Sequence, residues 1–267
     1  MRRFLLFLVL FGAGLSLVLL LERSEEEPEI PIDLPAEVPP DAGTETGPPN
    51  GEEPLEVPIR QGDDERALPP HLEALEMRRR LAGGEPSPSV AWSLGHIGHL
   101  HRRSGDHDQA RRLFEEGLAI SRRVYGEAHP EVAFLHRSLG MLHDETGRTD
   151  LAAGEYRRAA EIYRGVDATH PDLPTILVPL AKCEVQLGDP DAAEADAAEA
   201  RRLSETTGHY ADGVRPALEE LAGEIAFARG DLEGARAAYR RAVELRLAEH
   251  GEDDPRTARA RERLAGL

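Results

Sequence analysis

Apolar residues recur at spacings of three and four between residues 88 and 125, in two runs that a glycine separates. This spacing places each run on one face of an amphipathic helix. The first run contains Val90, Ala91, Leu94, Ile97 and Gly98, and the second contains Ala110, Phe114, Gly117, Leu118 and Ile120. Gly105, between them, is expected to end the first helix at a positive φ, and Asp106 or Asp108 can cap the second. The pattern predicts two helices packed face to face.

The same arrangement returns along the chain at a fixed period. The glycines that separate the two runs of each unit are Gly105, Gly147, Gly188 and Gly230, at steps of 42, 41 and 42 residues, and each is followed five residues later by an alanine. A proline marks the start of a unit at Pro88, Pro130 and Pro171, and Pro255 lies two periods after the last of these. A period of this size is typical of stacked supersecondary units that form a solenoid. We therefore predict an all-α helical-hairpin solenoid over residues 67–267.

The period also sets the expected boundaries. We expect four repeats, at about 88–126, 130–166, 171–207 and 213–250. A lone helix at 68–82 matches the second helix of an incomplete earlier unit, and a helix at 255–266 is expected to cap the last repeat. Such terminal helices are expected because an uncapped solenoid exposes apolar surface at its ends.

These residues resemble the tetratricopeptide repeat (TPR), and the 42-residue period with the His129-Pro130 and His170-Pro171 joints resembles its longer, kinesin-light-chain-like variety. The matching positions are the small residues Gly98, Gly140, Ala181 and Gly223, the aromatics Phe114, Tyr156 and Tyr239, and the alanines Ala159, Ala200 and Ala242. The resemblance implies a right-handed superhelix that binds a protein or peptide in a concave groove lined by the first helix of each repeat. The chain departs from the family at Ala197, where an aromatic is expected, and in lacking the asparagine pair that the longer variety often carries. Pro179 inside a helix is expected to bend the third repeat.

The resemblance places the partner-binding positions on the first helices. The candidate residues are Trp92, His99, Arg102, Arg103, Phe134, Arg137, Met141, Lys182, Glu224 and Phe227. Further groove positions are Gly95, Asp144, Glu145, Thr175, Val178, Val185, Ala217 and Glu220. The N-terminal half of this set is aromatic and basic, and the C-terminal half is acidic. Trp and Arg are typical anchor residues in protein interfaces, so we expect a peptide with an acidic or apolar anchor at the first two repeats. The alternative for Trp92 is packing against the 68–82 helix. Adjacent acids such as Glu219 and Glu220 are expected on a solvated face.

The N-terminal segment has a different character. Residues 4–21 are almost entirely apolar and follow Arg2 and Arg3, which predicts a signal-anchor or transmembrane helix over 1–21. A cleaved signal peptide is the alternative, although the run is long and has no small-residue cleavage site. The arginines favour a cytoplasmic N-terminus and a repeat domain in the periplasm or outside the cell. Residues 22–66 are acidic and rich in proline, which predicts a disordered linker. The linker is a spacer in one interpretation and an acidic docking segment in another.

The charge, the cysteine content and the lack of known motifs argue against several classes of function. The formal net charge is −18, made up of +2 in 1–21, −12 in 22–66 and −8 in 67–267, and this balance argues against nucleic-acid binding. Cys183, the single cysteine, excludes an internal disulfide and is expected to be buried. No catalytic or cofactor motif is present, so we predict a protein that is not an enzyme and has no cofactor. The leading hypothesis is a membrane-anchored interaction scaffold in envelope assembly, secretion or chaperone-like holding. The alternative is a ligand, metal or pH sensor that uses histidines such as His96 and His99 of the first repeats.

Overall fold

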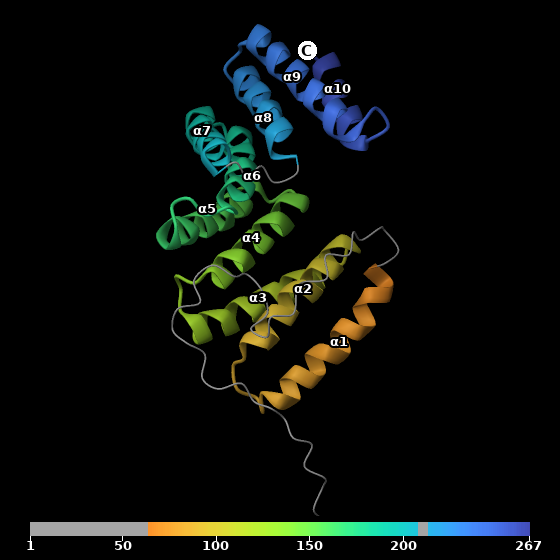
Figure 1. The fold of residues 1–267 in the computed structure, drawn as a ribbon, viewed down its shortest axis with the longest axis vertical. Coiled ribbons are helices and arrows are strands. Elements are labelled where there is room, and N and C mark those ends of the chain that lie inside the picture. Colours follow the sequence, from red (N-terminus) through yellow and green to blue (C-terminus); the bar gives the residue numbers. More distant parts are fainter. Residues whose placement is uncertain (1–63, 208–212) are drawn as a thin grey trace, which may run out of the picture. The chain divides into compact units, whose positions relative to one another are not determined.

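The structure is a computed structural model that describes residues 64–207 and 213–267, and those residues form ten helices with no strand among them (Figure 1). The helices are α1 (Asp64–Leu81), α2 (Pro88–Arg103), α3 (His107–Tyr125), α4 (Pro130–Glu145), α5 (Thr149–Val166), α6 (Leu173–Gln186), α7 (Pro190–Thr207), α8 (Val214–Ala228), α9 (Leu232–His250) and α10 (Pro255–Ala265). The predicted anchor (1–21) and most of the predicted linker (22–66) lie outside the described residues. The last three linker residues are helical, because α1 begins at Asp64. Within the described ranges, no helix is long and apolar enough to cross a membrane.

Eight of the helices form four pairs, α2 with α3, α4 with α5, α6 with α7 and α8 with α9. Each pair packs on the next one along the chain (Figure 1). The remaining helices cover the ends of this series, α1 against α2 and α10 against α9. The all-α solenoid of helical hairpins is therefore confirmed for the described residues.

The turns within the pairs follow the predicted chemistry. Gly105 has a φ of +82° and Gly188 a φ of +84°, in the left-handed region that glycine adopts without steric cost. The next residue then caps the second helix. The carboxylate of Asp106 accepts a hydrogen bond from the N–H of Gln109 (3.2 Å), and that of Asp189 accepts one from Ala192 (3.0 Å).

Three of the four pairs, all but α6 with α7, close on a contact between a glycine and an aromatic ring. A Cβ added to Gly98 would lie 2.5 Å from the ring of Phe114, and one added to Gly140 would lie 2.8 Å from the ring of Tyr156. The same contact joins Gly223 to Tyr239 at 2.9 Å. The absence of a side chain at these glycines lets the aromatic ring reach the backbone of the first helix. The small and aromatic residues on which the family resemblance rests are therefore the residues that bring the two helices of a pair into close contact.

The acids at 219 and 220 do not lie on a solvated face, so that expectation is wrong. Glu219 and Glu220 are both buried. The Glu219 carboxylate accepts hydrogen bonds from Arg201 (2.9 Å) and Arg241 (2.7 Å), which ties α8 to both α7 and α9. Glu220 pairs with the buried guanidinium of Arg246 at 2.6 Å. Buried carboxylates require such partners because their desolvation is costly.

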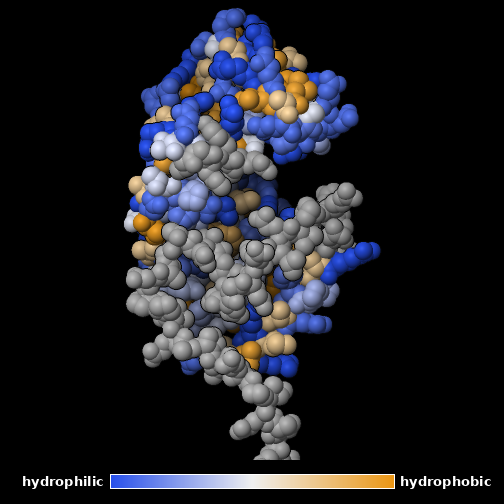
Figure 2. All heavy atoms as spheres, in the orientation of Figure 1, coloured by the Kyte–Doolittle hydropathy of each residue, from blue (hydrophilic) through white to orange (hydrophobic). Residues whose placement is uncertain are grey.

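Apolar side chains outside the core are scattered. Among the described residues, the large hydrophobic side chains that remain exposed include Met77 and Leu81 of α1 and Phe227 at the end of α8. The coloured atoms on the face drawn in Figure 2 are mainly hydrophilic, with small hydrophobic clusters between them. Isolated exposed apolar side chains are usual on protein surfaces and do not by themselves mark a binding site.

Candidate functional site

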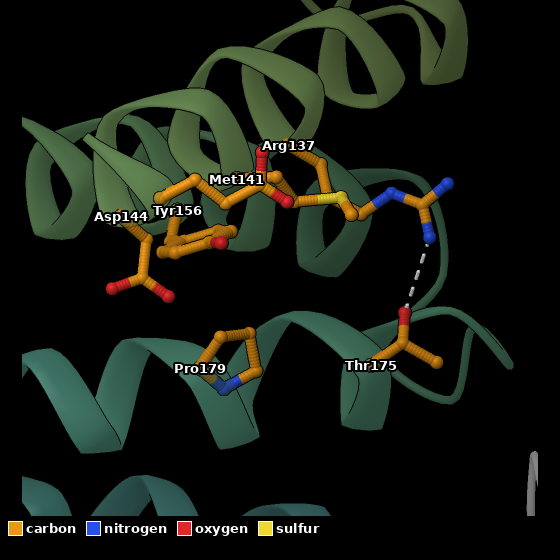
Figure 3. A pocket seen from close by; sticks show the side chains of 7 residues that line it. Arg137, Met141, Asp144, Tyr156, Thr175 and Pro179 are labelled. Atoms are coloured by element: carbon orange, nitrogen blue, oxygen red, sulfur yellow. Dashed lines mark hydrogen bonds between the residues drawn. The ribbon is translucent and has the colours of Figure 1, made fainter. Parts of the chain in front are cut away.

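A pocket of about 330 Å³ lies between the second and third helix pairs (Figure 3). Its lining residues are Arg137, Met141, Asp144 and Glu145 of α4, Tyr156 of α5, and Thr175 and Pro179 of α6. The α4 residues are spaced by three and four, so they share one face of that helix. The pocket brings together two of the predicted partner-binding residues, Arg137 and Met141, with three further predicted groove positions.

The packing of the first helices explains why the pocket lies at this place. The backbone of α6 packs closely against α8, and α2 approaches α4, but α4 and α6 have few close backbone contacts. Pro179 lies inside α6 and faces this gap (Figure 3). Proline has no N–H and its ring crowds the carbonyl four residues earlier, which bends a helix. The space between α4 and α6 is bridged by side chains.

Arg137 and Thr175 form one end of the pocket. A guanidinium N–H of Arg137 (Nη1) donates to the hydroxyl of Thr175 at 3.4 Å, and the guanidinium lies 5.4 Å from the centre of the Phe134 ring. The Nε atom of Arg137 is buried and has no hydrogen-bond partner. The Thr175 hydroxyl donates to the carbonyl of Asp172 at 2.7 Å. Arg137 is held in place by these contacts, and within the described ranges no carboxylate is in ion-pair contact with it.

The other end of the pocket is acidic. The carboxylates of Asp144 and Glu145 both lie there, but they differ in their partners. Glu145 forms an ion pair with Arg102 of the preceding repeat. Asp144 points into the pocket (Figure 3), and among the residues that the structure describes none forms an ion pair with it. The negative charge that remains available to a ligand is therefore that of Asp144.

The middle of the pocket is apolar. Met141 and the ring of Tyr156 lie on one side and the Pro179 ring on the other (Figure 3). Burial raises the pKa of Tyr156, helped by the nearby Asp144, so this phenol is neutral. The site therefore combines a cation, an apolar stretch and an anion along one wall. Sequence reasoning missed Tyr156 and Pro179, although Gly140 opposite an aromatic position is the signal that could have placed Tyr156.

Three predicted residues form an aromatic and histidine series on the first two repeats. The Trp92 ring packs against the His96 ring at a tilt of 46°, with 3.9 Å between ring centres, and His99 lies edge-on to Phe134 at 5.5 Å. The guanidinium of Arg78, on α1, lies 5.5 Å from the centre of the Trp92 ring. Trp92 is thus half-buried, with a side chain of α1 over its ring.

The histidines of this series are neutral. Burial, strengthened by neighbouring positive charges, lowers the pKa of His96 to about 4 and that of His99 to about 3. Ser138 exchanges a hydrogen bond with Nε2 of His99 at 3.0 Å. Among the described residues no three His, Cys, Asp or Glu side chains are arranged to hold a metal ion.

The other predicted residues do not line the pocket. Arg102 is engaged by Glu145, and Arg103 is exposed at the end of α2. Glu224 forms an ion pair with Arg263 of the terminal helix α10, and Phe227 is 54% exposed at the end of α8. Neither of these two C-terminal residues lines the pocket.

Lys182 lies on α6, three residues beyond Pro179, and does not line the pocket. Burial lowers its pKa, against the opposing effect of the Glu220 carboxylate. Within the part of the chain that the structure describes, no ion pair involves its amine.

Family comparisons match the described repeats. Three models, each described as "Tetratricopeptide repeat", match residues 59–122 and 89–165, residues 150–201, and residues 223–256. Together they span well over half of the chain. This protein belongs to the tetratricopeptide repeat family. Members of the family generally mediate protein–protein interactions and are typically non-catalytic scaffolds.

Curated relatives match over a short segment. Tetratricopeptide repeat protein 19, mitochondrial, from Homo sapiens is 37% identical over 73 residues, which cover 27% of this chain and 19% of that protein. The Rattus norvegicus protein of the same name is 34% identical over 73 residues, 27% of this chain and 20% of its own. The chain thus matches about a fifth of the length of these relatives.

Solved structures share the fold of this TPR protein over a longer span. BtubC (BKLC) from P. vanneervenii superposes with a TM-score of 0.61 at 23% identity, over 76% of this chain and 82% of that one. Kinesin light chain TPR-like repeats from Podosopora anserina superpose with a TM-score of 0.58 at 15% identity, over 70% and 88% of the two chains. The kinesin-light-chain-like character of the repeats is therefore confirmed at the level of the fold.

Proposed function

We propose that this TPR protein is a membrane-anchored scaffold that binds a protein partner in the groove of its repeats, outside the cytoplasm. Its setting would be envelope assembly, secretion or chaperone-like holding. The observation that carries the binding role is the pocket between α4 and α6, where Arg137 and Asp144 keep charges available to a ligand on either side of an apolar stretch. Convergent polar groups around an apolar pocket are typical of binding sites.

The chemistry of the pocket supports recognition and not catalysis. Its groups are a guanidinium, carboxylates, a thioether, a neutral phenol and a hydroxyl that already donates to a backbone carbonyl. None of the pocket side chains is a histidine or a thiol that could act as a base or nucleophile near neutral pH. Charged and apolar groups of this kind provide specificity for a partner.

The anchor in this proposal is supported by the sequence alone. The apolar run at 4–21 has the length of a membrane span, and the arginines before it favour a cytoplasmic N-terminus. The acidic, proline-rich residues 22–66 would then hold the repeats away from the bilayer.

Photo-crosslinking in native membranes tests the binding role. A photoreactive amino acid replaces Met141 in the full-length protein, and Ala198, exposed on α7, receives the same probe as the control. The proposal expects a discrete adduct from position 141 and none from 198, and mass spectrometry of that adduct would identify the partner. Equal or absent adducts from the two positions would contradict it.

The location is tested separately. Ala198→Cys provides an exposed thiol, whereas native Cys183 is buried. A membrane-impermeant maleimide should label this variant in intact cells, and deletion of residues 4–21 should release the protein from the membrane fraction. Labelling only after lysis would place the repeats inside the cytoplasm and overturn this part of the proposal.

A further inference from the structure

We propose that the pocket between α4 and α6 is a two-charge subsite for an extended peptide segment. An acidic side chain of the segment would bind at Arg137, and a basic side chain would bind at Asp144. This inference rests on the proposed function and names the class of partner for the same site.

The acidic side chain of the ligand is placed at Arg137 because this arginine has few partners within the protein. Its one side-chain hydrogen bond, to Thr175, is long at 3.4 Å, and its buried Nε has no hydrogen-bond partner. A carboxylate can accept two parallel N–H bonds from a guanidinium, which is the geometry that Arg prefers. The contact with the Phe134 ring orients the guanidinium before the ligand arrives, so less side-chain entropy is lost on binding.

The basic side chain of the ligand is placed at Asp144 because Asp144 and Glu145 differ in their ion-pair partners. The charge of Glu145 is compensated by Arg102, whereas no described arginine or lysine is within ion-pair distance of Asp144. The amine of Lys182 is the cation on the neighbouring turn of α6, and the Glu220 carboxylate affects it more strongly than Asp144 does. A lysine or arginine of the peptide would therefore supply the missing counter-charge at Asp144.

The spacing of the two charges fits an extended chain. Arg137 and Asp144 are seven residues apart on α4, which corresponds to about 10 Å along the helix axis. An extended peptide rises about 3.3 Å per residue, so charges two to four residues apart can reach both ends. Met141, Tyr156 and Pro179 lie between the ends and leave room for small apolar residues in the middle of the segment.

Pro179 also provides a place for the peptide backbone. In a regular helix the N–H of residue 179 would donate to the carbonyl of Thr175, but proline has no N–H. The Thr175 carbonyl therefore lacks its helical donor on the side of α6 that contributes Thr175 and Pro179 to the pocket. A peptide N–H can supply that donor.

Peptide binding to the full-length protein in detergent micelles tests the inference. The probes are short capped fluorescent peptides with glutamate and lysine separated by one, two or three alanines. Matched probes carry glutamine in place of glutamate, or norleucine in place of lysine. The variants are Arg137→Gln and Asp144→Asn, and the control is Arg158→Gln on the exposed side of α5. Circular dichroism and the unfolding midpoint verify that each variant is folded.

The inference expects tighter binding of a two-charge probe than of either single-charge probe, by about tenfold for each lost charge contact. Arg137→Gln should remove only the preference for glutamate, and Asp144→Asn only the preference for lysine. Both preferences should weaken at high salt. Two results would overturn the inference: charge preferences that persist in folded Arg137→Gln and Asp144→Asn, or charge preferences that Arg158→Gln removes equally.

The two proposals can fail separately. A discrete adduct from position 141, combined with peptide binding that shows no charge preference, would overturn the two-charge subsite and leave the scaffold function standing. Charge-selective peptide binding without any adduct in native membranes would support the subsite and contradict the scaffold function.

Discussion

The ring of Tyr156 lies against the backbone of Gly140, so closely that a Cβ on this glycine would be 2.8 Å from two ring carbons. Gly140→Ala should therefore force the ring to move and lower the free energy of unfolding by about 1–3 kcal/mol. Because Tyr156 also lines the pocket, the same variant should weaken partner binding. Urea unfolding followed by circular dichroism measures the first effect, and crosslinking from position 141 measures the second.

Gly154 offers the matched control for this prediction. It lies in α5 of the same helix pair, and a Cβ added there would have no atom within 4 Å. Gly154→Ala should raise the stability by about 0.5–1 kcal/mol, because alanine has the better helix propensity. Similar effects of the two substitutions would show that the ring contact is not tight.

Glu131 should make the stability of the repeats depend on pH. It lies in the first turn of α4, where the helix dipole favours a carboxylate, but burial dominates and raises its pKa to about 7. A raised carboxyl pKa means that the folded state holds the proton more tightly than the unfolded state. Stability from this group is then present below pH 4.5, and it is lost as the pH rises to about 7.

Glu131→Gln tests this dependence, because glutamine retains the shape without the charge. At pH 8 the variant should be more stable than the wild type by on the order of 2 kcal/mol, and near pH 4 the two should be similar. Unfolding midpoints across this range measure the difference. A constant difference between the two proteins at all pH values would contradict the role of ionisation.

The ion pair between Glu220 and Arg246 should be costly to break from one side. Both side chains are buried, and the Nε and Oε1 atoms are 2.6 Å apart. Arg246→Met alone or Glu220→Leu alone should lower the stability by about 3–5 kcal/mol, since each leaves a buried charge without its partner. The double variant should recover most of this loss. Additive losses in the double-mutant cycle would show that the pair is not coupled.

His96 and His99 should stay neutral well below neutral pH. Their lowered pKa values, about 4 and about 3, mean that the unfolded state takes up protons that the folded state does not. The repeats should therefore lose stability as the pH falls below about 6.5. NMR titration of the imidazole carbons measures these pKa values. If burial lowers them, neither residue should show a titration midpoint above pH 5. Midpoints near 6.5 would mean that both side chains are solvated.

Pro179→Ala should stabilise α6 and impair binding. The substitution restores an N–H donor for the Thr175 carbonyl and should raise the stability by about 1–3 kcal/mol. It also removes the ring that forms one wall of the pocket. Loss of the crosslinked adduct together with a higher unfolding midpoint is the expected result. A more stable variant that crosslinks as well as the wild type would show that the proline has no role in binding.

The turns and helix-pair contacts could be predicted from the sequence because they depend on neighbouring residues. Gly105 and Asp106 define a helix end and a cap within a few positions, and the distance from Gly140 to Tyr156 is fixed by one short turn. Each of these relations recurs in three of the four repeats, so the copies support one another's assignment.

The pocket depends on relations that the sequence does not show. The ion pair of Arg102 with Glu145 joins residues 43 positions apart, and it decides which of two adjacent acids is available to a ligand. Glu219 looks like a solvated acid in the sequence, but arginines from α7 and α9 reach it. Trp92 could have faced either a partner or α1, and only the position of Arg78 distinguishes the two.

The single lysine of the chain has a practical consequence. Lys182 is the only side-chain amine among 267 residues, and it lies one turn beyond the pocket. Amine-directed coupling, which is routine for attaching proteins to resins and sensor chips, can therefore reach only the N-terminus and this position. A pull-down experiment prepared by that chemistry risks blocking the surface it is meant to present, whereas coupling through an engineered thiol on α7 leaves it open.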